Sequence, residues 1–108
     1  MPAMLQTDTL AIANGANLSS AVALRDARSG CISLPAALTA TSAKFRLSAD
    51  GSTYVYAKDT AGTDLSITVG TSRIVQLPAA LFAGAPWLKL EMGSNEGADR
   101  SIAIMLKD

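Results

Sequence analysis

Residues Lys44 to Ala57, KFRLSADGSTYVYA, decide the fold class. Phe45 and Leu47 alternate with polar neighbours, which is the period of a half-buried β-strand. An Asp50-Gly51 pair follows, and Tyr54 to Tyr56 then resumes the residue types that favour strands. Asp-Gly between two such segments favours a two-residue primed turn, because both residues tolerate the positive φ that this turn needs. The stretch therefore predicts an antiparallel β-hairpin.

The same period of two recurs along the rest of the chain, with turn residues between the segments. The apolar residues expected to face inward are Leu10 and Ile12; Leu18, Val22 and Leu24; Leu65, Ile67 and Val69; Leu88, Leu90 and Met92; and Ile102, Ile104 and Leu106. Short strands separated by turns every eight to twelve residues are typical of a sandwich or barrel. We expect one all-β domain over residues 1–108, an antiparallel, jelly-roll-like two-sheet sandwich of about eight strands.

Two segments of the chain resemble each other. Ser29 to Leu38 reads SGCISLPAAL, and Ser72 to Leu81 reads SRIVQLPAAL. Each leads into an alternating strand, Lys44 to Ala49 in the first copy and Trp87 to Met92 in the second. Proline ends regular pairing because it has no N–H to donate. Either a duplication or two similar corners of a sandwich explains the pattern, and both interpretations predict comparable places for these two strands.

Composition narrows the classes of function. Nine basic and nine acidic residues give a formal net charge of zero, and 49% of the residues are hydrophobic. A nucleic-acid groove or an anionic membrane calls for a basic excess, so neither partner is expected. Near-zero net charge favours association. No N-terminal segment has the pattern of a signal peptide, which predicts synthesis in the cytoplasm without secretion.

The sequence offers little catalytic chemistry. It contains no histidine, and a nucleophilic cysteine needs a nearby base, so Cys31 is expected to be a small buried hydrophobe. The carboxylates are expected in solvated turns, at strand starts or on outward strand faces. Asp59, Asp64, Glu96 and Asp99 together are a conceivable calcium set, but their spacing matches no calcium loop. We expect no enzyme activity, no metal and no cofactor.

Three aromatic residues are the candidate contact residues, namely Tyr54, Tyr56 and Trp87. Aromatic side chains with a polar group are enriched at interfaces and also form platforms for sugar rings. The competing interpretation is that the two tyrosines complete the core with their hydroxyl groups at its rim. For Trp87 the two interpretations are evenly balanced.

Three stretches carry a family resemblance: LPAALTATSAKFRLSADGSTYVYAKDTAGTDLSITV, SRIVQLPAALFAGAPWLKLEMGS and ADRSIAIMLKD. Together they resemble a family of small, Ala-rich proteins encoded among the structural genes of tailed bacteriophages and prophages. The resemblance covers about Leu34 to Leu106, and S-x-D-G-x-x-Y and A-L-F-A-G-x-x-W-L-K-L are its most specific parts. A looser similarity, to galactose-binding-like jelly-roll domains, concerns the fold more than the function.

This resemblance implies a component of the virion, made in the host cytoplasm. The expected function is that of a capsid decoration or cement protein, whose partners are its own copies, as a trimer or another symmetric oligomer, and the major capsid protein. The alternative is a carbohydrate-binding module or a tail-associated component used in host adsorption, with a surface glycan as its ligand.

Overall fold

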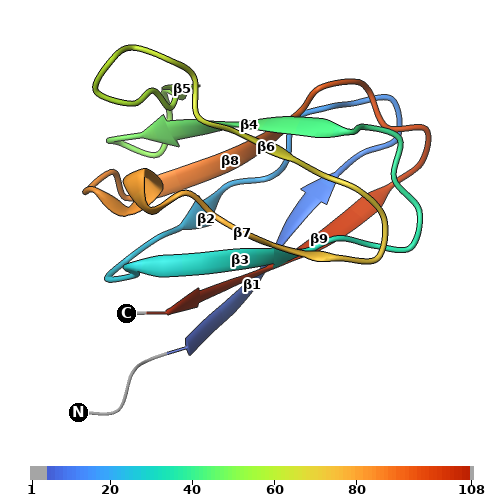
Figure 1. Cartoon of the computed structure of the whole chain (residues 1–108), viewed down its shortest axis with the longest axis horizontal. Helices are drawn as coiled ribbons and strands as arrows, with labels where there is room; N and C mark the ends of the chain where they lie inside the picture. Colours follow the sequence, from blue (N-terminus) through green and yellow to red (C-terminus); the bar gives the residue numbers. More distant parts are fainter. Residues whose placement is uncertain (1–4, 108) are drawn as a thin grey trace.

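The computed structural model describes residues 5–107, which form an almost entirely antiparallel β structure (Figure 1). Its elements are β1 (Leu5–Ile12), β2 (Val22–Ala23), β3 (Ser29–Ser33), β4 (Ser42–Ser48), β5 (Val55–Tyr56), β6 (Ser66–Thr68), β7 (Ile74–Gln76), the 3-10 helix η1 (Ala79–Phe82), β8 (Trp87–Met92) and β9 (Arg100–Lys107). Sheet A has the strand order β1-β9-β3-β7. Sheet B has the order β2-β8-β4-β5, and β6 also pairs with β4. The prediction of an all-β, two-sheet sandwich is confirmed.

The core lies between the inner faces of the two sheets. In β8 and β9 every second residue is buried, which is the pattern that the sequence predicted. Sheet B contributes Phe45, Leu88 and Leu90, each at most 1% exposed, and sheet A contributes Ile32 and Ile104 at 0%. Side chains of successive strand residues point to opposite faces, so the remaining positions of each strand make the outer faces.

The two LPAAL corners occupy equivalent places, as predicted. Each carries the chain from sheet A to sheet B, from β3 to β4 in the first copy and from β7 to β8 in the second (Figure 1). β3 pairs with β7 in sheet A, and β4 pairs with β8 in sheet B. The first corner is a loop, as expected. The second contains η1, where Leu81 is fully buried.

The predicted two-residue turn at Asp50-Gly51 is wrong. β4 and β5 do pair, with Arg46 opposite Tyr56, but a longer loop joins them. The Asp50 carboxylate accepts N–H bonds from Ser52 and Thr53, which stabilises this wider loop. Only Gly51 has a positive φ, of 82°, whereas a type I′ turn needs two positive values.

Other boundaries differ from the sequence pattern. β1 begins at Leu5, four residues before the predicted Thr9, because its N-terminal half pairs with the end of β9. Only Val22 and Ala23 of the predicted Leu18-to-Leu24 strand are paired as a strand, and Leu18 makes a single bridge. Cys31 is half-buried on the outer face of sheet A and not a core residue.

Glu96 is the clearest error among the predicted solvated carboxylates. Its side chain is 0% exposed, and its oxygen atoms accept bonds from the backbone N–H of Thr39 and Ala40 and from Arg100 Nε at 2.8–2.9 Å. Burial acts to raise the pKa of Glu96, but these donors outweigh it, so the pKa lies below its usual value. The contacts fix the first LPAAL corner to the loop between β8 and β9.

Candidate binding faces

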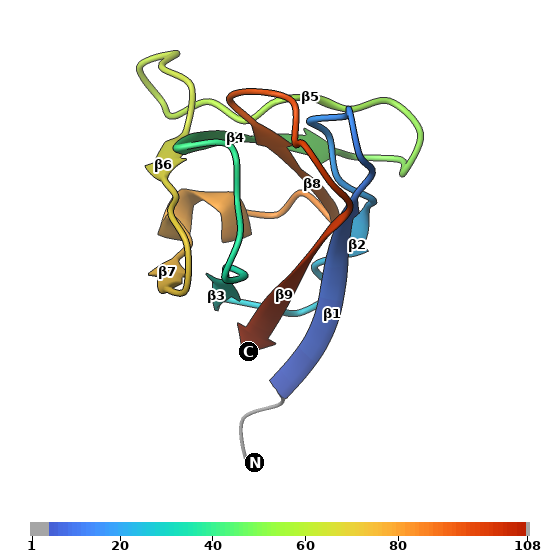
Figure 2. The ribbon, with the colours of Figure 1, turned by 90° about the vertical axis from the view of Figure 1, so that its right-hand side faces the viewer.

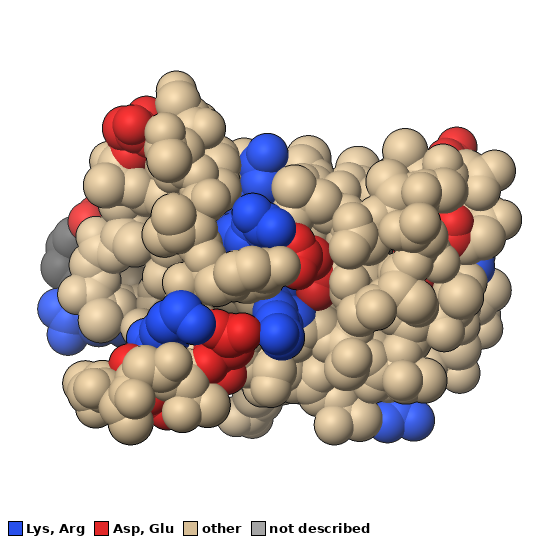
Figure 3. Space-filling model, turned by 90° about the horizontal axis from the view of Figure 1, so that it is seen from above, with Lys and Arg blue, Asp and Glu red and all other residues tan. Residues whose placement is uncertain are grey.

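The outer face of sheet B gathers charged and aromatic side chains, and we call it the charged face. Outward positions of β4 and β8 supply its centre, and β5 and its preceding loop supply the tyrosines. Its members are Lys44, Arg46, Tyr54, Tyr56, Trp87, Lys89 and Glu91. Figure 3 looks onto the molecule from this side and shows basic and acidic side chains gathered next to one another in the middle of the face. All three aromatic residues singled out from the sequence therefore lie on one surface.

An ion pair on adjacent strands organises the charged face. Arg46 donates to Glu91 Oε1 through Nε at 2.8 Å and through Nη2 at 2.6 Å, and the Tyr56 hydroxyl donates to Glu91 Oε2 at 2.6 Å. The Arg46 guanidinium also lies 4.4 Å from the centre of the Tyr56 ring, a cation–π distance. Burial acts to raise the pKa of Glu91, but Tyr56 and Arg46 outweigh it and hold the pKa below its usual value.

The other two aromatic residues also have intramolecular partners. Lys89 Nζ lies 4.5 Å from the centre of the Tyr54 ring. Trp87 is half-buried under the β4–β5 loop, where a Cβ added to Gly51 would lie 3.2 Å from the indole. Tyr56 is the most accessible of the three, at 38% exposed. The face thus combines ring surfaces with hydrogen-bonding groups, but the rings also stabilise its own loop.

The conceivable calcium ligands do not form a cluster. Asp59 and Asp64 lie between β5 and β6, where Asp64 pairs with Lys44 and Lys58. In the loop between β8 and β9, Asp99 accepts the backbone N–H of Asn14. Across residues 5–107, no group of three or more cysteine or carboxylate side chains is placed to hold a metal ion. Each acidic side chain instead has local donors from the protein.

The outer face of sheet A is nearly uncharged, and we call it the small-residue face. Its members, read from the strand register, are Leu5, Thr7, Thr9 and Ala11 of β1; Ser101, Ala103, Met105 and Lys107 of β9; Ser29, Cys31 and Ser33 of β3; and Ile74 and Gln76 of β7. Lys107 is the only ionised side chain in this set. Leu5 and Ile74 are 68% and 65% exposed. Sequence reasoning missed this face, although the small residues alternating with the core positions of β1 and β9 were a signal for it.

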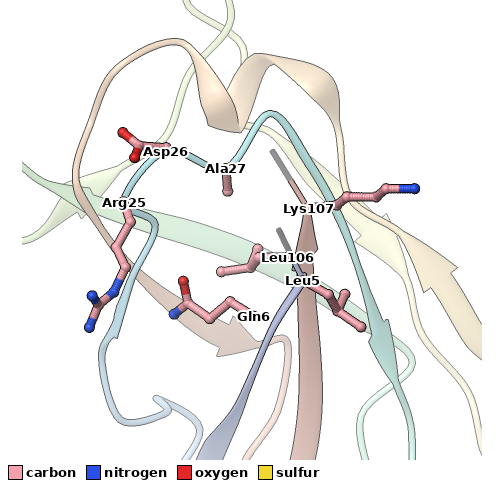
Figure 4. Close-up of a pocket in the computed structure, with 7 residues that line it drawn as sticks. All are labelled: Leu5, Gln6, Arg25, Asp26, Ala27, Leu106 and Lys107. Atoms are coloured by element: carbon pink, nitrogen blue, oxygen red, sulfur yellow. The ribbon is translucent and has the colours of Figure 1, made fainter. Parts of the chain in front are cut away.

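Two depressions lie where β1 and β9 reach the end of the sandwich. A cavity of about 110 Å³ separates the start of β1 from the Arg25–Ala27 turn, and Gln6, Ala27 and Leu106 point into it (Figure 4). A shallower groove of about 480 Å³ crosses the small-residue face near Cys31, Gln76 and Met105. Neither depression contains a set of residues suited to catalysis.

Comparisons with known proteins show the fold. No protein-family profile and no curated protein sequence matches the chain. Among solved structures it is similar to the SPBc2 prophage-derived protein YomS, with a TM-score of 0.66 and 12% identity over 100% of this chain and 96% of the other. Two looser similarities both have a TM-score of 0.46. One is to a chain of Bacillus endospore appendages, described as disulfide-linked pili, with 12% identity over 97% of this chain and 86% of the other. The second is to a chain of the cyanophage Pam1 capsid asymmetric unit, with 16% identity over 97% of this chain and 82% of the other.

The likeness to YomS covers all of this chain and nearly all of the other, so the sandwich is a fold already known in a protein of prophage origin. Within residues 5–107, no helix has the length and apolar character needed to cross a membrane.

Proposed function

We propose that this protein is a non-enzymatic structural component of a bacteriophage particle, a decoration or cement protein that stabilises the capsid. Its partners in this proposal are its own copies and the major capsid protein. The sequence resemblance to phage structural proteins supports it, and so does the prophage origin of YomS, which shares the fold. The observation that carries the proposal is the small-residue face.

The small-residue face suits burial against another protein surface. Small side chains let two backbones approach closely, and a face with one charge at its end requires little desolvation of ions. Leu5 and Ile74, on opposite edge strands of the sheet, add exposed apolar area to this face. The absence of histidine and the local pairing of Glu91 and Glu96 give no support to a catalytic centre.

A charge placed in the middle of the small-residue face tests the proposal. Ala103 lies between Thr9 and Ser33 in the sheet A register, so Ala103→Arg puts a cation at the centre of the face. The matched control is Ala61→Arg, at an exposed position in the loop before β6. Quantitative mass spectrometry of purified particles measures how much of each variant is incorporated.

We expect Ala61→Arg to be incorporated like the wild type and Ala103→Arg to fall by more than about tenfold, because burying an unpaired charge is costly. A circular dichroism spectrum checks that both variants retain the sandwich. If the wild-type protein is absent from particles, or if the two variants are incorporated equally, the proposal is wrong.

A second candidate function is carbohydrate binding during host adsorption, as a module on its own or as part of the tail. The observation that favours it is that Tyr54, Tyr56 and Trp87 share the charged face with hydrogen-bonding groups. A glycan array with the wild type, Tyr54→Ala and Met105→Ala separates the two functions. A specific sugar signal that is lost only in Tyr54→Ala supports binding on the charged face, and no signal for the wild type rejects it.

A further inference from the structure

The free edge of β1 is open over its first residues. At the other end of the strand, the Ala11 N–H donates to Ser20 Oγ and the Ala11 carbonyl accepts from the Ser20 N–H, so Ala11 faces away from β9. Backbone groups alternate in direction along a strand, which makes those of Leu5, Thr7 and Thr9 face the same way. The Thr9 N–H is bonded to the Asp8 carboxylate, and the Thr9 carbonyl accepts from Ser20 Oγ at 3.4 Å, so in the single chain Thr9 already has partners on this edge. In the part of the chain that the structure describes, no donor or acceptor meets the main-chain groups of Leu5 and Thr7.

This edge has little protection against pairing. Natural edge strands are shielded by Lys, Pro, a bulge, a covering loop or an inward-pointing charge. Ser20 covers the strand at Thr9 and Ala11, and Asp8 is a charge on the inward parity, but Leu5 to Thr9 contain no Lys, Pro or bulge, and Leu5, Thr7 and Thr9 are exposed. Figure 2 shows the start of β1 extending beyond the other strands. A second strand therefore has access to the edge.

We propose that two copies of this chain pair through β1 about a two-fold axis, with Thr7 opposite Thr7 of the second copy. Leu5 then pairs with Thr9 of the second copy, and Gln6 with Asp8. The two sheets A become one antiparallel sheet of eight strands. The proposal rests on the proposed function, because it specifies how the chain associates with its own copies. It can be tested with the purified protein, without phage particles.

The charges of the strand select this register. An axis through Asp8 would place two carboxylates directly opposite each other, which is destabilising, whereas an axis through Thr7 places Asp8 opposite neutral Gln6. Threonine opposite threonine is a favourable cross-strand pair. In this register even-numbered residues pair with even-numbered ones, so the small-residue faces of both copies lie on the same side of the joined sheet.

Arg25 supplies the complementary charge. It lines the cavity beside Gln6, and Figure 4 shows its side chain on the side of β1 away from β9. Arg25 has no acidic partner within residues 5–107, and Asp8 accepts only the N–H of Thr9 there. Asp8 of the second copy lies next to Gln6 and therefore near Arg25. The two-fold axis repeats this contact, so the dimer contains two Arg25–Asp8 pairs.

Disulfide cross-linking tests the register. In antiparallel pairs the facing Cα atoms are about 4.5–5.5 Å apart, within the range that a disulfide spans. Thr7→Cys in a Cys31→Ser background is expected to form a covalent dimer on mild oxidation. Thr9→Cys in the same background is the control, because it lies on the same strand and face but opposite Leu5. Equal cross-linking of the two variants overturns the proposal, and so does a Thr7→Cys variant that remains monomeric.

Charge exchange tests the contact between Arg25 and Asp8. By sedimentation equilibrium we expect Asp8→Arg or Arg25→Asp alone to weaken the dimer about tenfold, since each replaces an attraction by a repulsion. The double variant is expected to recover most of the affinity. Failure of the double variant to recover while its circular dichroism spectrum matches the wild type contradicts the contact.

The outcomes separate this inference from the proposed function. A protein that dimerises through Thr7 but is absent from particles refutes only the phage proposal. A protein that is monomeric in solution and still incorporated into particles refutes only the β1 pairing.

Discussion

The outward positions of the strands carry different side chains on the two outer faces of the sandwich. They are charged or aromatic on the charged face and mostly small and uncharged on the small-residue face. The charged face places ions and rings beside one another, so that Arg46, Glu91 and Tyr56 satisfy each other. The small-residue face places Thr, Ser and Ala at the same kind of position. The comparison teaches that the charged face contributes to the stability of a single chain, while the small-residue face leaves its surface free for another.

The largest loss of stability is expected for the buried carboxylate of Glu96, in the loop between β8 and β9. This loss is the reference with which the losses on both faces are compared. Glu96→Gln removes one partner of the buried pair with Arg100 and leaves the guanidinium unpaired. We expect a loss of about 3 kcal/mol in the free energy of unfolding, measured by urea denaturation. Asp99→Asn, an exposed carboxylate in the same loop, is the control and should cost less than about 1 kcal/mol. Equal losses would show that the burial of Glu96 is unimportant.

A matched pair of truncations compares the faces directly. Trp87→Ala on the charged face removes the packing of the indole against the Gly51 loop, and we expect a loss of about 2 kcal/mol, below the value for a fully buried ring. Met105→Ala on the small-residue face should cost less than about 1 kcal/mol, because Met105 lacks such a covering loop. Thermal unfolding followed by circular dichroism measures both. A larger loss for Met105→Ala would reverse the comparison.

The ion pair at the centre of the charged face should contribute more stability than the exposed pair in the neighbouring loop between β5 and β6. Glu91→Gln weakens three charge-assisted bonds, two from Arg46 and one from Tyr56, at a carboxylate whose side chain is 13% exposed, and we expect a loss of about 1 kcal/mol. Lys58→Met removes a pair whose lysine is 52% exposed and should change stability by less than about 0.5 kcal/mol. Urea denaturation at low and high salt measures both variants. If both lose the same stability, the partial burial of Glu91 has no effect.

The smallest effect is expected on acidification, at Asp50 in the loop that covers Trp87 of the charged face. Hydrogen bonds from Thr53, Ser52 and Ser48 lower the pKa of Asp50 to about 2 from 3.8. A carboxyl group whose pKa is lower in the folded chain contributes stability above its unfolded pKa and loses it as the pH falls through the folded value.

The stability difference between the wild type and Asp50→Asn should therefore be present at pH 7 and disappear between about pH 4 and pH 2. The difference for Met105→Ala, which has no carboxylate neighbour in the sheet register, should stay constant over that range. Urea denaturation across this pH range measures both differences. A constant difference for Asp50→Asn would contradict the role of its hydrogen bonds.

The sequence predicted the parts of the fold that depend on local alternation. Leu88, Leu90 and Ile104 lie in long runs of period two, and all are buried as expected. The equivalence of the two corners was also predictable from the sequence, because an identical LPAAL segment precedes two similar strands. That the aromatic residues share one face follows from the β4–β8 register, which is a non-local property.

What the sequence did not predict depends on contacts between distant segments. Glu96 resembles any other loop carboxylate until the fold brings to it the donors of Thr39 and Ala40, which are 57 and 56 residues away in the sequence. Cys31 occupies an apolar run but falls on the outward parity of β3, which only the pairing with β9 decides. The open edge of β1 was likewise invisible, since alternation does not say which strands are at the edge of a sheet.

The pairing of β1 with β9 has a consequence for the order of folding. Leu5 lies opposite Lys107, so the first strand has to wait for the last strand of the sheet to leave the ribosome. Closing so long a loop makes this step slow compared with the local β4–β5 pairing. During that interval both edges of β1 are exposed on nascent chains that one messenger RNA holds close together. Newly made chains can therefore meet through the free edge of β1. This is the same edge through which we propose that folded chains form a dimer.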